Sequence, residues 1–277
     1  MTFKIGIHYP NPAAVTPLIE AFEHGLKRHN VIVESTKFPN QINCDLAVCW
    51  NHRNHRLFKQ QRQSGRDYLC LERGFIGNRM EWTALCFNGL NGNADWSHCE
   101  NSPPDRAFQY HSDKMQDYCL NPEGVFLIIG QVPGDASILH VDMPGWYQQM
   151  IAKAKTDYAD TRIIFRPHPL CVERHIETVP EGVDGVSDKT LADDFKRAAI
   201  CVTMNSNTGV ESVLAGVPTI AYDPGAMAYD VTPHQITEDH EMIDRTQWFF
   251  DLAYKQWNRE ELANGDAWDH VRKRYGI

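Results

Sequence analysis

The stretch VFLIIGQVPGDAS, residues 125–137, joins an apolar run to a turn of glycine and polar residues. A short apolar run that ends in turn residues is typical of a strand buried on both faces of a sheet. The pattern recurs at 162–166 and at 199–203, and segments with helical spacing of apolar residues separate the runs. This alternation predicts a parallel α/β sheet in which the loops after the three strands lie at one edge.

The same alternation extends along the whole chain. In the second half it predicts helices at 145–156, 191–198 and 208–215 and a further strand at 218–222. In the first half it predicts strands at 3–8, 31–34, 45–50 and 67–72 and helices at 13–29 and 53–63. Residues 73–96 are rich in glycine, asparagine and aromatic residues, and we interpret them as a long functional loop.

The predicted fold class is α/β, with two Rossmann-like halves facing one another across a cleft. Turn-rich segments at 101–104 and 121–124 bracket the connection between the halves. The predicted domains are a Rossmann-like domain at 1–120, a ligand-binding domain at 121–245 and C-terminal helices at 246–277.

The composition excludes several classes of protein. A net charge of -9 argues against a broadly basic surface for nucleic acid. The sequence contains no apolar run long enough to span a bilayer, and its first residues lack the pattern of a signal peptide. The 8 cysteines include no CxxC pair, so we expect reduced thiols, no metal site and a cytoplasmic location.

The first loop of the second half, 130–137, offers an amide at Gln131, a carboxylate at Asp135 and a hydroxyl at Ser137. Such groups bind polar ligands, and a carboxylate can act as a base or attack an activated anomeric carbon. The simpler interpretation is a β-turn that Asp135 caps, and the composition alone favours it.

The second loop places His168 between two prolines, just after Arg166. The Arg166 guanidinium fits a phosphate, and an imidazole can donate a proton to a phosphate or to a leaving group. A proline-rich turn with a surface histidine is the alternative. Because two prolines fix the imidazole beyond the strand end, we favour a binding role for Arg166, His168 and Pro169.

The third loop leads directly into a helix through Asn205, Ser206, Asn207 and Thr208. The backbone N–H groups and the dipole of a helix start form an anion site, and Glu211 can accept hydrogen bonds from ribose hydroxyls. An ordinary N-cap uses the same residue types. Four of them in a row exceed what a cap needs, so the loop predicts phosphate binding.

A further candidate site lies around the loop predicted in the first half. It mixes charged and amide side chains with aromatic rings, which suits a sugar or a base, although a solvated loop would have the same composition. Its polar members are Glu72, Arg73, Asn78, Arg79, Asn88 and Asn91.

Taken in order, GQVPGDASI at 130–138, FRPHP at 165–169 and TMNSNTGVESVLAGVPTIAYD at 203–223 resemble a known family. They are similar to the core of bacterial capsular polysaccharide synthesis proteins, the retaining Kdo (3-deoxy-manno-octulosonate) transferases. The resemblance covers about residues 125–230 and implies a glycosyltransferase of the GT-B architecture.

The resemblance also implies roles for single residues. His168 and Pro169 would contact the phosphate of the donor nucleotide, and Glu211 would lie beneath the nucleotide. The loop that contains Ser206, Asn207 and Thr208 would complete this site. Asp135 would be the catalytic carboxylate or nucleophile, a role that the composition of its loop alone does not indicate.

The first half is similar to other proteins. LERGFIGNR at 71–79 and FNGLNG at 87–92 resemble uncharacterised proteins of tailed phages. Soluble phage glycosyltransferases often modify hydroxymethylated pyrimidines in DNA, so the resemblance adds a DNA base to the possible acceptors, which otherwise are a polysaccharide or a glycolipid.

The resulting hypothesis is a metal-independent glycosyltransferase whose co-substrate is a CMP- or UDP-linked sugar and which needs no other cofactor. N–H donors and the helix dipole would stabilise the departing phosphate. Asp135 or Glu72 would provide the carboxylate chemistry, and the first half would present the acceptor. A phage enzyme that glycosylates DNA bases, a nucleotide-sugar epimerase and a non-catalytic nucleotide-binding protein are the alternatives.

Overall fold

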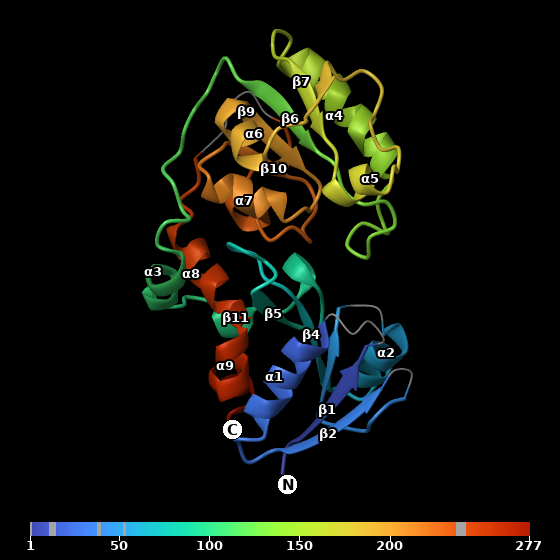
Figure 1. Ribbon diagram of the computed structural model, residues 1–277, viewed down its shortest axis with the longest axis vertical. Helices are drawn as coiled ribbons and strands as arrows, with labels where there is room; N and C mark the ends of the chain where they lie inside the picture. Colours follow the sequence, from blue (N-terminus) through green and yellow to red (C-terminus); the bar gives the residue numbers. More distant parts are fainter. Residues whose placement is uncertain (1, 11–14, 38–39, 52–53, 237–241) are drawn as a thin grey trace. The chain divides into compact units, whose positions relative to one another are not determined.

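The computed structural model describes residues 2–10, 15–37, 40–51, 54–236 and 242–277. The chain forms two compact units (Figure 1), unit 1 from Met1–Tyr110 with Phe249–Ile277 and unit 2 from His111–Trp248. Each unit has its own α/β sheet and its own hydrophobic core. None of the described helices combines the length and the apolar character needed to cross a membrane.

Unit 2 is built on a five-stranded parallel sheet in the order β10-β9-β6-β7-β8. The strands are β6 (Val125–Ile129), β7 (Ile163–Arg166), β8 (Gly185–Val186), β9 (Ala198–Thr203) and β10 (Thr219–Ala221). The helices are α4 (Met143–Asp157), α5 (Pro169–Glu173), α6 (Leu191–Arg197) and α7 (Thr208–Leu214). The strands and helices predicted for this half are therefore present, within a few residues at their ends.

Strand β6 lies at the centre of the sheet and is buried on both faces. Phe126 and Ile128 pack on one side in a core that includes Trp146 of α4. Leu127 and Ile129 belong to a second cluster on the other side. This is why the segment has an uninterrupted apolar sequence and no alternation.

The strand order of unit 2 reverses next to β6. From β6 the chain continues to β7 and β8 on one side, and it then crosses to β9 and β10 on the other. Strands β6 and β9 therefore flank the topological switch point, and ligands of open α/β sheets bind beside the carboxyl ends of the strands at such points.

Unit 1 has a six-stranded sheet in the order β11-β5-β4-β3-β1-β2. Strands β1 (Lys4–Tyr9), β2 (Ile32–Lys37), β3 (Leu46–Trp50) and β4 (Asp67–Arg73) are parallel, while β5 (Trp82–Phe87) and β11 (Gln256–Asn258) run antiparallel to their neighbours. The helices are α1 (Thr16–Leu26), α2 (His55–Gln63), α3 (Asp105–His111), α9 (Arg259–Asn264) and α10 (Asp266–Val271). Helix α8 (Thr246–Tyr254) carries the chain back from unit 2.

The interpretation of residues 73–96 as one long loop was wrong in part. Trp82–Phe87 form β5, a strand whose six residues are all buried. Its sequence, WTALCF, is short and lacks polar alternation, because both of its faces are covered. The asparagines and glycines on either side of β5 are typical of loops, and for this reason the strand between them was not predicted.

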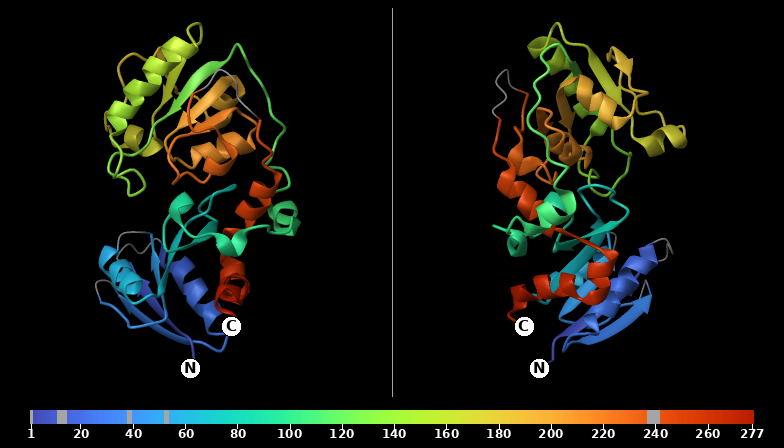
Figure 2. Two further views of the ribbon diagram at one scale, coloured as in Figure 1. Left: turned by 180° about the vertical axis from the view of Figure 1, so that it is seen from behind. Right: turned by 60° about the vertical axis from the view of Figure 1, so that its left-hand side comes forward.

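The C-terminal residues are an integral part of unit 1. Strand β11 pairs with β5, and Leu262, Ala267 and Trp268 enter the core beneath β1. A Cβ at Gly25 of α1 would lie 2.1 Å from the carbonyl oxygen of Leu262, so only glycine allows α9 to approach this closely. Figure 2 shows the C-terminal segment (red) beside α1 (blue).

The observed divisions of the chain thus differ from the predicted ones at 120/121 and 245/246. They fall at 110/111 and at 248/249, and residues 249–277 join unit 1 instead of forming a separate group of helices. The physical reason is pairing over long sequence separation, which periodicity within the segment does not reveal.

Candidate functional site

Two buried amides connect the loops on either side of the switch point in unit 2. Gln131 Nε2 donates to Asn205 Oδ1 (2.8 Å), and the Asn205 backbone N–H donates to Gln131 Oε1 (3.1 Å). Asn205 Nδ2 also donates to the carbonyl oxygen of Ser137 (2.7 Å). Because both amides are buried and satisfy one another, they fix the two loops. We call this pair the Gln131–Asn205 clamp.

Tyr147 of α4 forms a hydrogen bond to the backbone of the clamp residue Gln131. Its hydroxyl accepts the backbone N–H of Gln131 (3.0 Å). Burial raises the pKa of Tyr147 to about 12, so the hydroxyl stays protonated at neutral pH. Sequence reasoning did not single out this residue, because an aromatic side chain within a helical pattern is usually a core residue.

Asp135 lies in a turn, as the composition of loop 130–137 predicts. Its backbone N–H donates to the carbonyl oxygen of Val132 (3.1 Å), and Gly134 has a φ of 77°. Its Oδ1 accepts the backbone N–H of Ser137 (2.9 Å) and the Ser137 hydroxyl (2.8 Å). A chain of hydrogen bonds therefore leads from the clamp through Ser137 to Asp135, whose side chain is exposed.

Arg166 is occupied in a way that the sequence did not predict. Its Nη1 donates to Asp194 Oδ2 (2.5 Å) and to the carbonyl oxygen of Lys189 (2.8 Å). Asp194 is completely buried and is also bound by Ser187 and Arg197. The Nη1 group of Arg166 thus compensates a buried carboxylate beside the end of β7, and phosphate binding by the rest of the guanidinium stays a prediction.

His168 caps the short helix α5. Its Nδ1 accepts the backbone N–H of Leu170 (3.1 Å), and its main chain is extended before Pro169. An Nδ1 that accepts a hydrogen bond places the proton of the neutral imidazole on Nε2. The ring is half-buried and Pro169 is exposed. The cap and a donor role for Nε2–H are therefore compatible.

The third loop forms its own local hydrogen bonds before α7 begins. The Ser206 backbone N–H donates to the Thr203 hydroxyl (3.1 Å), and the Thr208 backbone N–H donates to the Ser206 hydroxyl (3.2 Å). Asn207 precedes the helix, and Glu211 is half-buried in its first turn. Part of the hydroxyl-rich sequence therefore shapes the turn itself.

Sequence reasoning missed a contact between a histidine and an aspartate at this edge. It joins the loop after β6, already described, to the loop after β10. His140 Nε2 lies 2.5 Å from Asp223 Oδ2. Asp223 is buried and also accepts the backbone N–H of Gly225 (2.6 Å). The signal in the sequence was the position of Asp223 directly after the last predicted strand.

A pocket of about 440 Å³ lies in unit 2 beside the first loop. Gln131 and Pro133 line it together with Tyr147 from α4 and with residues 177–180 after α5. Gln131 thus belongs both to the clamp and to the wall of a cavity large enough for part of a small ligand.

Glu72, the second predicted catalytic carboxylate, and three of the predicted acceptor-side residues lie near the carboxyl end of β4 in unit 1. Glu72 Oε1 accepts the backbone N–H of Arg73 (2.9 Å), and Arg79 Nε donates to the carbonyl oxygen of Gly74 (2.6 Å). Asn78 follows in the turn between β4 and β5. These four residues belong to one segment, 72–79, at and just after the end of β4.

Asn88 and Asn91 do not belong to this group. Because β5 runs antiparallel to β4, Asn88 lies beside the start of β4, where its Nδ2 donates to Asp67 Oδ1 (2.6 Å) and its Oδ1 accepts the Tyr68 N–H (3.1 Å). The length of β4 separates the two ends by roughly 20 Å. Asn88 and Asn91 have φ values of 55° and 50°, so both are turn residues at the opposite edge of the sheet.

Comparisons with known proteins identify the fold. No protein-family model matches the chain, and no curated protein matches it. Among solved structures, the β-Kdo 2,4-transferase KpsC of Thermosulfurimonas dismutans is similar with a TM-score of 0.65, at 14% identity over 93% of this chain and 92% of that chain. The β-Kdo 2,7-transferase KpsC of the same organism has a TM-score of 0.56, at 14% identity over 95% of this chain and 98% of that chain. At this identity the likeness concerns the fold, and it confirms the predicted GT-B-like α/β class.

Proposed function

We propose that the protein transfers a sugar from a nucleotide-activated donor to an acceptor hydroxyl and that unit 2 binds the donor. The Gln131–Asn205 clamp carries this proposal, because it holds the loops of Asp135 and of Ser206 together at the switch point. The carboxyl edge of a parallel sheet is the usual ligand site at such a point. The fold likeness to two Kdo transferases favours sugar transfer over other reactions of nucleotide-binding folds.

The donor nucleotide would be bound by the second and third loops. His168 offers an Nε2–H donor at the end of β7, and the start of α7 offers the Ser206 and Thr208 hydroxyls and the positive end of the helix dipole. Glu211 in the first turn of α7 would accept hydrogen bonds from the ribose. A CMP-linked sugar is the first candidate for the donor and a UDP-linked sugar the second.

Transfer breaks the bond between the anomeric carbon and the phosphate oxygen, and the bonding electron pair leaves with the nucleotide. A new bond forms between that carbon and the acceptor oxygen, whose proton passes to a base. The exposed carboxylate of Asp135 would serve this chemistry as nucleophile or base. N–H donors near the phosphate would stabilise its developing charge, which is how a transferase can work without a metal ion at the reacting bond.

The acceptor side is proposed for unit 1, with Glu72, Arg73, Asn78 and Arg79 as its polar residues. Asn88 and Asn91 are left out because they lie at the other edge of the sheet. A polysaccharide or glycolipid hydroxyl is the first candidate for the acceptor, and a hydroxymethylated DNA base remains a prediction from the resemblance of the first half. A DNA acceptor would make binding fall steeply with salt concentration.

A thermal-shift panel with CMP, UMP, UDP, GDP and ADP tests the donor site. A ligand that binds only the folded protein raises the apparent stability by mass action. We expect a selective shift with CMP, or with UDP for a hexose or pentose donor. The substitution Asn205→Ala should remove the shift, whereas Asn121→Ala, at the amino edge of the same sheet, should keep it.

The same panel distinguishes the alternatives. An absence of any shift with the wild-type protein would refute the nucleotide site. If a nucleotide binds, incubation with the matching nucleotide-sugar should release nucleotide faster when an acceptor is present. Turnover that is independent of acceptor would instead indicate an epimerase or a hydrolase.

A further inference from the structure

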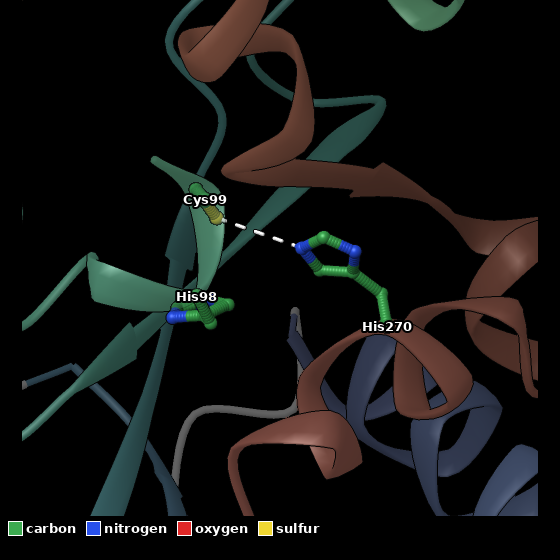
Figure 3. A group of neighbouring side chains, drawn as sticks. All are labelled: His98, Cys99 and His270. Atoms are coloured by element: carbon green, nitrogen blue, oxygen red, sulfur yellow. Dashed lines mark hydrogen bonds between the residues drawn. The ribbon is translucent and has the colours of Figure 1, made fainter. Parts of the chain in front are cut away.

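Three side chains of types that commonly bind metals meet in unit 1. None of them belongs to the loops of unit 2 described above. Figure 3 shows His98 and Cys99, from the short 3₁₀-helix Ser97–Cys99, next to His270 of α10. One possible ligand atom from each residue lies within 4.8 Å of the other two. Cys99 Sγ lies 3.7 Å from His270 Nε2, although 171 positions separate them in the sequence.

The group is enclosed and only partly satisfied by hydrogen bonds. Cys99 is completely buried, and its thiol contacts the carbonyl oxygen of Tyr254 at 3.5 Å. His98 Nδ1 is buried and has no hydrogen-bond partner among the residues that the structure describes. Buried polar atoms in native proteins are nearly always paired, so the unpaired nitrogen of His98, a residue grouped with a thiol and a second imidazole, needs an explanation.

Aromatic rings surround the group on several sides. The ring of His98 lies 5.1 Å from that of Phe87 and 6.0 Å from that of Trp96, between centroids. The ring of His270 lies 5.0 Å from that of Tyr254 and 5.3 Å from that of Trp257. The three ligand atoms therefore lie in largely aromatic surroundings.

The spacing fits a tetrahedral ion. With Zn–S near 2.3 Å and Zn–N near 2.0 Å, a tetrahedral zinc site separates sulfur from nitrogen by about 3.5 Å and two nitrogens by about 3.3 Å. The Cys99–His270 distance already has this value within a few tenths of an ångström. Rotation of the His98 side chain would supply the remaining approach, because its Nδ1 makes no hydrogen bond to the described residues that would have to break.

We propose that His98, Cys99 and His270 bind one Zn²⁺ ion, with a solvent molecule as its fourth ligand. A thiolate and two imidazoles are the ligand types that zinc prefers, and hard cations such as Mg²⁺ and Ca²⁺ prefer oxygen. Binding breaks the S–H bond of Cys99 and forms an S–Zn bond, and the proton passes to solvent.

The ion would lie in unit 1 and would not take part in the proposed transfer reaction. It would join the segment before α3 to α10, and so fasten the C-terminal residues to the first part of unit 1. A search by sequence spacing does not find such a site, because its ligands come from two ends of the chain and include no CxxC pair.

The test uses the full-length protein, purified with a reductant, stripped with a chelator and titrated with Zn²⁺ or Co²⁺. We expect about one equivalent of Zn²⁺ to bind, measured by elemental analysis after gel filtration. With Co²⁺ we expect the visible bands of a tetrahedral site and a near-ultraviolet sulfur-to-cobalt charge-transfer band. Added Zn²⁺ should remove both features by displacement.

Matched variants assign the ligands. Cys99→Ser should abolish the charge-transfer band, while Cys119→Ser, which changes an exposed thiol, should leave it unchanged. His270→Gln should weaken Zn²⁺ binding by at least about tenfold, as expected for loss of a ligand. Circular dichroism establishes that each variant is folded.

Two outcomes would overturn the proposal. One is a wild-type protein that takes up no stoichiometric Zn²⁺ and shows no thiolate band with Co²⁺, a result that needs no variant. The other is a band that Cys119→Ser removes as completely as Cys99→Ser. Neither outcome depends on nucleotide binding, so the proposed transferase activity stands or falls separately.

Discussion

At the scale of the residue, the Asp135 side chain combines a structural contact with a proposed chemical role, and one substitution separates the two. Asparagine retains an Oδ1 that can accept both hydrogen bonds from Ser137, so Asp135→Asn should preserve the turn. The amide cannot act as nucleophile or base. We therefore expect transfer to fall by at least about a thousandfold, a loss typical of a missing catalytic group.

Nucleotide release and calorimetric binding check this prediction together. The affinity of Asp135→Asn for the nucleotide should stay within about twofold of the wild-type value, since the carboxylate is not expected to bind the nucleotide. Asp188→Asn, at an exposed carboxylate of the same unit, is the control and should retain full activity. Loss of both transfer and binding in Asp135→Asn would show a role in folding or donor binding, and would remove the catalytic assignment.

His168 likewise has two separable contacts. Its Nδ1 caps α5 by accepting the Leu170 N–H, and its Nε2–H is the proposed donor to a phosphate. Asparagine is a good N-cap and supplies an equivalent acceptor, but it lacks the second nitrogen at the far side of the ring. His168→Asn should therefore keep the thermal stability of the protein and weaken nucleotide binding by about tenfold.

The variant His168→Ala removes the cap as well. It should weaken nucleotide binding by the same factor as His168→Asn. It should also lower the unfolding free energy by about 1 kcal/mol, the usual contribution of a helix cap. Isothermal titration and urea unfolding measure the two effects. Unchanged nucleotide affinity in both variants would exclude His168 from the donor site.

His8 gives unit 1 a defined dependence on pH. Its Nδ1 lies 3.0 Å from the Gly6 carbonyl oxygen, and its Nε2 accepts the Ile42 N–H (3.2 Å), so the buried ring is neutral. Burial lowers the pKa of His8, against the opposing effect of its backbone hydrogen bond to Gly6. The unfolded chain takes up a proton first, so the stabilisation is complete above about pH 6.5 and is lost as the pH falls toward the folded-state pKa.

Urea unfolding at about pH 7.5 and about pH 5.5 checks this sign. The wild-type protein should lose more stability than His8→Gln over this interval, by at most about 1.4 kcal/mol per pH unit. Equal losses in the two proteins would show that His8 takes up its proton equally in the folded and unfolded states.

At the scale of the element, the loops after β6 and β9 act together through the clamp. Gln131 and Asn205 exchange two hydrogen bonds in a buried position, so removal of either leaves the other unpaired. A double-mutant cycle with Gln131→Ala and Asn205→Ala should give a coupling energy of about 1–2 kcal/mol. Additive losses of stability would mean that the two loops are fixed independently of one another.

Strands β6, β7 and β9 of unit 2 could be predicted from sequence because they are apolar runs that end in turn residues, whereas the two-residue strand β8 was not predicted. Strand β5 could not, because its buried WTALCF sequence is flanked by asparagines and glycines that are typical of loops. The omission of β5 also explains the error at Asn88 and Asn91. An antiparallel strand between them and Glu72 moves them to the opposite edge of the sheet.

The site residues show the same limit. Proximity of the loops follows from parallel topology, so the sequence brings Gln131 and Asn205 to one edge. The choice of partner does not follow from topology. The sequence does not show that Arg166 pairs with the buried carboxylate of Asp194. Nor does it show that Asp223 lies beside His140, the contact that makes Asp223 a candidate site residue. Side-chain pairs over long sequence separation are the information that a single sequence lacks.

At the scale of the whole molecule, the chain leaves unit 1 and returns to it, so the C-terminal residues must be held against a part of the fold formed far earlier in the sequence. Arg106 of α3 provides such an anchor. It is buried, pairs with the buried carboxylate of Glu261 in α9, and donates to the Gln256 carbonyl oxygen (2.9 Å). Its guanidinium also lies 3.9 Å from the ring centroid of Trp257.

Because both charges are buried, their removal one at a time should be far more harmful than their removal together. Arg106→Met leaves the Glu261 carboxylate uncompensated and should lower the unfolding free energy of unit 1 by about 3–5 kcal/mol. The double variant Arg106→Met/Glu261→Met removes both charges and should recover most of this loss, except for the hydrogen bonds from Arg106 to the backbone of the C-terminal segment and the capping bond that Glu261 accepts from the Asn258 N–H. Urea unfolding of the three proteins measures the difference. If the double variant is no more stable than Arg106→Met, the backbone hydrogen bonds and the contact with Trp257 hold the C-terminal segment in place, and the ion pair contributes little to the stability of unit 1.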